Sequence, residues 1–67
     1  MRGIMHTTTI TLQELADIME ILTITSRQDD AAFLTTTGYH PTLGRLVIVQ
    51  GIEEILLASE FPLRPTV

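Results

Sequence analysis

The stretch from Thr11 to Ile24 reads TLQELADIMEILTI, and the interpretation of the rest of the chain depends on it. Its first residues have the spacing of a capping box, in which the Thr11 hydroxyl and the Glu14 carboxylate each bind a backbone N–H of the first turn. Its apolar residues recur at helical spacing, about 100° per residue. The residues that share one arc are Leu15, Ile18, Met19 and Leu22. The sequence therefore predicts one long helix over residues 11–24.

This helix also carries aliphatic residues on its polar side. Ile21 lies between Glu14 and Asp17 on the helical projection, and Ile24 lies beside Asp17. A surface helix needs only one apolar stripe. Two interpretations remain open: a core helix with a few exposed aliphatics, or a helix that packs both on its own sheet and on a second chain.

The flanking segments have strand and loop patterns. Residues 5–10 are dense in β-branched residues and predict a strand. The polar residues 25–30, TSRQDD, predict a loop, and AAFLTTT at 31–37 predicts a second strand. Two glycines and a proline within residues 38–44 indicate another loop. Residues 45–50 are apolar on both alternating faces, which predicts a strand at the centre of the sheet.

The C-terminal third predicts a second helix and a tail. Residues 52–60 have an inner stripe at helical spacing, which leaves Leu57 on the outer side among glutamates, and Pro62 ends the helix. The expected fold is thus a small α+β domain over residues 1–61, in the order β-α-β-β-α. It has a three-stranded, mainly antiparallel sheet with two helices packed on one face. Residues 62–67 form an extended tail.

Length and composition favour association with another chain. A domain of 67 residues buries only about 60% of its unfolded surface, and small domains usually need disulfides, a metal or a partner. The chain has no cysteine, yet 45% of its residues are hydrophobic. We expect a homodimer or docking on a larger protein. The candidate interface residues are the misplaced aliphatics, a loop tip and one acid: Ile21, Ile24, Leu57, Tyr39, His40 and Glu53.

Several classes of function are disfavoured. The net charge is −4 and the four arginines are scattered, so nucleic-acid binding is not expected. No apolar run reaches the ~18 residues of a membrane span, and no signal peptide is recognisable, so we expect a cytoplasmic protein. The two histidines lie far apart, and adjacent acids do not face each other on a helix or strand. We expect no catalytic, metal or cofactor site, and no enzyme.

Residues 13–19, QELADIM, resemble the first helix of a helix-turn-helix repressor, in which Leu-Ala recurs before the turn. The resemblance covers about ten residues and implies a recognition helix near residues 25–32. The chain departs from the pattern at Glu20, where a turn glycine is usual. Asp29 and Asp30 would also face DNA phosphates.

Two functions are therefore considered. The leading hypothesis is a small acidic protein-interaction module that regulates or inhibits a larger protein by binding it. Phage-encoded inhibitors are similar in size and charge, and no motif supports that comparison. The alternative is a helix-turn-helix transcriptional regulator.

Overall fold

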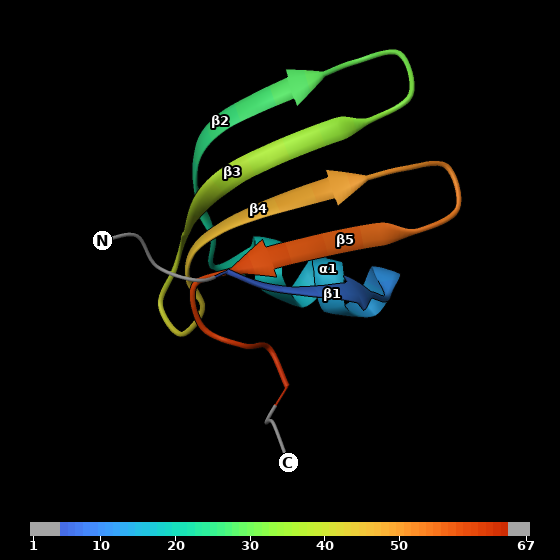
Figure 1. Cartoon of the computed structure of the whole chain (residues 1–67). Helices are drawn as coiled ribbons and strands as arrows, with labels where there is room; N and C mark the ends of the chain where they lie inside the picture. The colour runs from blue at the N-terminus through green and yellow to red at the C-terminus, as the bar shows by residue number, and fades with distance from the viewer. Residues whose placement is uncertain (1–4, 65–67) are drawn as a thin grey trace.

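The computed structural model describes residues 5–64. These residues form a single antiparallel sheet with one helix on one of its faces (Figure 1). In chain order the elements are β1 (His6–Ile10), α1 (Leu12–Glu20), β2 (Thr23–Asp29), β3 (Leu34–His40), β4 (Gly44–Gln50) and β5 (Ile55–Ser59). The expected three-stranded sheet with two helices is wrong.

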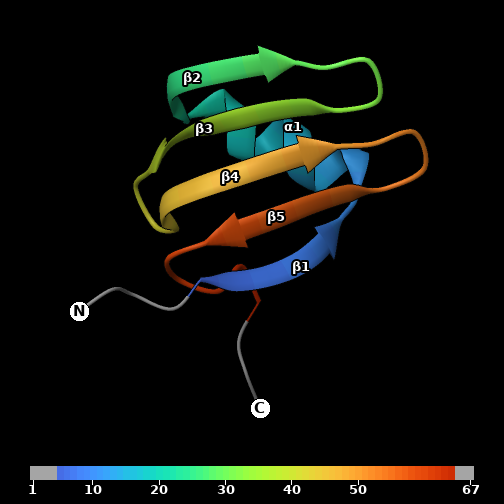
Figure 2. The same ribbon diagram turned by 45° about the horizontal axis from the view of Figure 1, so that its top comes forward.

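The sheet has five strands in the order β1-β5-β4-β3-β2, and every neighbouring pair is antiparallel. Strands β2 to β5 follow one another through hairpins, and β1 closes the order by pairing with β5 (Figure 2). The predicted position of β4 at the centre of the sheet is confirmed. Both of its edges are therefore paired, and Leu46 and Ile48 face the helix side whereas Val47 and Val49 lie on the opposite face.

Helix α1 begins as predicted and ends early. Glu14 N–H donates to Thr11 Oγ1 at 3.1 Å, and Thr11 N–H donates to the Glu14 carboxylate at 2.8 Å, which completes the capping box. The helix stops at Glu20 instead of continuing to Ile24. The N–H groups of Ile21 and Leu22 both turn back to the Met19 carbonyl, and β2 begins at Thr23.

Two segments differ from the predicted type, and β3 (Leu34–His40) lies three residues later than the predicted strand 31–37. Residues 25–30 were expected to be a loop, but most of them belong to β2, an edge strand in which every side chain is exposed. An exposed edge needs no apolar alternation, so its polar sequence resembles a loop. The predicted helix 52–60 is instead the β4–β5 hairpin followed by β5. Residues 55, 57 and 59 of β5 are buried, with the two-residue period of a strand.

The core lies between α1 and the covered face of the sheet. Leu46 and Ile48 of β4 and Leu57 of β5 are almost completely buried, and Leu15, Met19, Leu22 and Leu63 pack against the same cluster. The predicted exposure of Leu57 is wrong, because this residue belongs to a strand and faces the helix side with 0% exposure. Thr36 is also fully buried on this face, and its hydroxyl has no hydrogen-bond partner.

Candidate functional site

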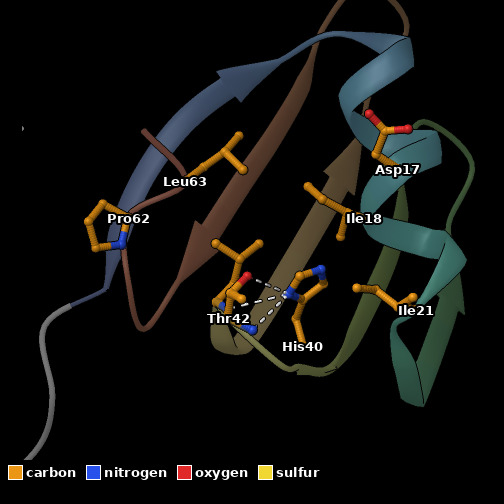
Figure 3. Close-up of a pocket in the computed structure, with 8 residues that line it drawn as sticks. Asp17, Ile18, Ile21, His40, Thr42, Pro62 and Leu63 are labelled. Atoms are coloured by element: carbon orange, nitrogen blue, oxygen red, sulfur yellow. Dashed lines mark hydrogen bonds between the residues drawn. The ribbon is translucent and has the colours of Figure 1, made fainter. Parts of the chain in front are cut away.

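An open pocket lies on the helix side of the sheet, beside the end of α1. Its volume is about 400 Å³. Three segments build it: the C-terminal half of α1, the β3–β4 turn and the C-terminal segment after β5 (Figure 3). We call it the corner pocket. Its lining consists of Asp17, Ile18, Ile21, His40, Thr42, Leu43, Pro62 and Leu63.

The β3–β4 turn holds His40 in a fixed orientation. The backbone N–H groups of Thr42 and Leu43 donate to His40 Nδ1 at 3.2 and 3.3 Å, and Thr42 Oγ1 lies 3.2 Å from the same atom (Figure 3). Because Nδ1 accepts these bonds, the neutral ring carries its proton on Nε2. That nitrogen lies on the ring edge toward α1 in Figure 3. The pocket therefore has an N–H donor in a defined position.

Glycine is required where this turn enters β4. Gly44 has φ +74°, a conformation that side chains with a Cβ rarely adopt. A Cβ at this position would also lie 2.5 Å from the Glu60 carboxylate. The same carboxylate accepts the N–H of Arg45 at 3.1 Å. The turn is thus tied to the segment that follows β5.

The C-terminal segment forms the opposite wall. Phe61 N–H donates to the Leu43 carbonyl at 3.0 Å, and Leu63 packs against the core. Arg64 then forms an ion pair with Glu14 at 2.6 Å and donates to Thr8 Oγ1 at 3.0 Å. The N–H of Thr11 and then the Arg64 guanidinium stabilise the Glu14 carboxylate, so its pKa lies below the ordinary value of 4.5. These contacts keep residues 61–64 against the body of the protein.

The chemistry of the corner pocket suits binding of an apolar group. Ile18, Leu43 and Leu63 line its floor and walls, and Ile21 stands 56% exposed at its rim. The polar groups at the pocket are an imidazole, a hydroxyl and a carboxylate. Asp17 Oδ1 accepts a hydrogen bond from Gln13 at 3.1 Å. Within residues 5–64, no group of three or more histidines and carboxylates is placed to hold a metal ion.

The structure gathers four of the six predicted interface residues at one end of the molecule. Ile21 and His40 line the same pocket. Ile24 is 42% exposed and pairs with Gly38, next to Tyr39, which is 53% exposed. The other two predicted residues lie elsewhere, Leu57 in the core and Glu53 at the exposed tip of the β4–β5 hairpin.

The sequence interpretation missed Leu43, Pro62 and Leu63 as pocket residues. Leu43 was assigned to a polar loop, although it is 3% exposed. Leu63 was assigned to an extended tail. In both cases the available signal was a single aliphatic residue between turn-forming residues, and a single exposed aliphatic residue is common on protein surfaces.

The sequence interpretation also missed the second surface, which is the face of the sheet opposite α1. In Figure 2 the sheet lies in front of the helix, and no described segment crosses its near side. We call this surface the open face. The strand registers place its side chains in two central rows. One row is Thr9, Leu56, Val49, Thr35 and Gln28, and the other is Thr7, Ala58, Val47, Thr37 and Ser26.

Comparison with known proteins gives no match: no family model, curated protein or solved structure is similar to this chain. Helix α1, the one helix within residues 5–64, is neither long nor apolar enough to cross a membrane. The function is therefore inferred from the surfaces alone.

Proposed function

We propose that this protein is an interaction module that regulates or inhibits a larger protein by binding it through the corner pocket and its rim. The observation that carries the proposal is the exposure of Ile21 and Ile24 beside a pocket with apolar walls. An aliphatic or aromatic side chain of the partner would fill the pocket as an anchor. Such buried anchors dominate the affinity of protein interfaces.

The surroundings of the pocket indicate the character of the partner surface. Asp17 lines the pocket and Glu20 lies three residues further along α1, so the helix side of the corner is acidic. A partner with an apolar centre and a basic rim would complement this corner. His40 Nε2–H provides a directional donor, which a carbonyl or hydroxyl oxygen of the partner would accept. We further propose that the protein acts in the cytoplasm.

The helix-turn-helix alternative lacks its recognition helix. Residues 25–32, where that helix was expected, belong to β2 and to the hairpin that follows it. Within residues 5–64, α1 therefore has no second helix to pair with. A DNA-binding mode that depends on that motif is not proposed for this fold.

The proposal is tested with two substitutions on one helix. The partner is captured from the native cell with tagged protein, and its affinity for purified variants is then measured by calorimetry. Ile21→Glu places a charge at the pocket rim, and we expect it to weaken binding by at least about tenfold. Leu12→Glu is the matched control, because Leu12 is 74% exposed on α1 and lies outside the pocket.

The control is expected to bind within about twofold of the parent chain. Circular dichroism and the urea midpoint should remain close to those of the parent for both variants, because both positions are exposed. Equal affinities for the Ile21 and Leu12 variants would refute a docking role for the pocket.

A further inference from the structure

The open face has the composition of a covered surface. At the centre of its two rows lie four aliphatic residues, Val47, Val49, Leu56 and Ala58, which are half-buried. Threonines of β1 and β3 border them on both sides. None of the ten residues in the two rows is charged, although the chain carries a net charge of −4. In an antiparallel sheet, the face that is exposed to water usually carries polar residues.

The two ends of the open face differ in charge. At the end near the corner pocket, Tyr39 pairs with Arg45, and both side chains are exposed. Within residues 5–64 the Arg45 guanidinium has no hydrogen-bond or ion-pair partner. This end therefore has one guanidinium without a described partner beside an exposed phenol ring, and the Glu60 carboxylate, which accepts the Arg45 backbone N–H at 3.1 Å, lies next to them.

The other end consists of the tips of the β2–β3 and β4–β5 hairpins, which lie side by side (Figures 1 and 2). Leu34 pairs with Gln50, so Phe33 is level with Gly51. A Cβ on Gly51 would lie 3.6 Å from the Phe33 ring, so the 52% exposed ring lies over this glycine. The carboxylates of the two hairpin connections at these tips are Asp30, Glu53 and Glu54, whereas Asp29 pairs with Leu34 and so faces the helix side of the sheet.

We propose that the open face is a dimer interface and that its occupant is a second copy of this chain. The two sheets pack face to face, about 10 Å apart, around a two-fold axis that runs across the strands. The axis passes near the paired residues Thr36 and Ile48. Three residues to either side of Ile48 are Arg45 and Gly51, and three to either side of Thr36 are Phe33 and Tyr39.

This symmetry matches the two unlike ends of the face. Arg45 of each copy lies over the Phe33 ring and the acidic tips of the other, which provides cation–π and ion-pair attraction. Tyr39 of each copy meets Phe33 of the other, and the aliphatic centres pack on each other. An axis parallel to the strands would instead place the two acidic ends of the face against each other. Charge therefore selects one of the two face-to-face arrangements.

The size of the face predicts a reversible dimer. Five strands at ~4.8 Å spacing and ~3.4 Å per residue give a face of roughly 20 × 20 Å. The two copies would together bury roughly 800 Å², which is below the size of stable interfaces and in the range of weak, transient ones. The corner pocket is on the helix side of the sheet and stays open in the dimer. The inference thus stands independently of the proposed function.

The symmetry is tested by cross-linking, because the chain contains no cysteine. A Tyr39→Cys variant and a Phe33→Cys variant are treated, separately and mixed, with a bismaleimide that spans the ~10 Å between packed sheets. We expect covalent dimers in the mixture and only background levels in either variant alone. Efficient cross-linking of one variant alone, or none in the mixture, would overturn the proposed axis.

The interface is tested by sedimentation equilibrium between ~10 µM and ~1 mM chain. Arg45→Glu should raise the dimer dissociation constant at least about tenfold. Arg27→Glu makes the same change of charge on the exposed edge strand β2, where Arg27 pairs with Thr36 and so lies on the opposite face, and it should leave the constant unchanged. A parent chain that stays monomeric over this range, or equal constants for the two variants, would refute the dimer. Neither result bears on the Ile21 test.

Discussion

The two faces of the sheet use similar residues in different environments. Along β5, Ile55 and Leu57 face α1 and are buried, whereas Leu56 and Ala58 alternate with them on the open face and are half-buried. Along β4, Leu46 and Ile48 are buried while the valines between them are not. The hydrophobicity of a residue therefore does not decide whether that residue is buried within a single chain. Helix α1 covers one face. The other face would be excluded from water to the same extent only if a second chain covered it.

The largest expected difference between the faces comes from neighbouring leucines of β5. Leu57→Ala opens a cavity in a site with 0% exposure and should reduce the free energy of unfolding by about 2–5 kcal/mol. Leu56→Ala removes the same atoms from the open face and should reduce it by less than about 1.5 kcal/mol in dilute protein. Urea unfolding measures both. Equal losses would show that the open face is as well packed in the single chain as the covered face.

Two glycines provide a second, smaller contrast. Gly38 of β3 pairs with Ile24 of β2, and a Cβ at this position would collide with the Thr23 carbonyl oxygen. Gly38→Ala should therefore destabilise the fold by about 1–3 kcal/mol, as overpacking does. Gly51 belongs to the open face, and its Cβ would meet the Glu54 carbonyl at 3.3 Å. Gly51→Ala should change the free energy of unfolding by less than about 1 kcal/mol in the same thermal or urea experiment.

Two adjacent threonines of β3 give a third contrast, in which substitution at the buried position is expected to increase the stability of the fold. The hydroxyl of Thr36 is buried on the covered face without a partner, so Thr36→Val should stabilise the protein by about 1 kcal/mol. Thr37 is half-buried on the open face, and Thr37→Val should change stability by no more than about 0.5 kcal/mol. A loss of stability in the Thr36 variant would indicate that the hydroxyl is satisfied in solution. Calorimetric melting of the two variants distinguishes these outcomes.

The smallest predicted effect concerns pH, because neither face contains a carboxylate at its centre. The pKa of Glu14 is lowered in the folded chain, so its contribution to stability is present above about pH 4.5 and is lost as the pH falls through the folded pKa. Glu14→Gln should therefore flatten the decline in urea midpoint below pH 4.5. Glu20→Gln is the control on the same helix. An unchanged pH profile in the Glu14 variant would mean that its bonds to Thr11 and Arg64 do not persist in solution.

The sequence predicted some elements because their signals are local. The capping box at Thr11 and Glu14 depends on residues three apart, and the structure confirms it. β1 and β4 have dense β-branched or apolar runs and were placed within one residue of their bounds. At the candidate site, Ile21 and His40 were selected for different reasons, an aliphatic on a polar side and a loop tip. The fold then placed both in one pocket.

Two strands could not be predicted, for two different reasons. In the segment that contains β5, residues 52, 55, 56 and 59 fit a helical stripe while 55, 57 and 59 fit a strand, so periodicity alone does not distinguish the two. Pairing with β4 on one edge and β1 on the other decides in favour of the strand. In β2, full exposure removes any apolar pattern, and only the hydrogen bonds to β3 define the strand.

By itself, the sequence determined the start of α1 and the central strand β4. It also showed that the chain has many apolar residues and no cysteine that could form a stabilising disulfide. The tertiary structure decided where these apolar residues lie. It buried Leu57, left Ile21 and Ile24 at the rim of a pocket, and aligned four aliphatic residues on an uncovered sheet face. The physical reason is that burial depends on which segments pair across the sheet, and pairing between distant residues leaves no trace in local periodicity.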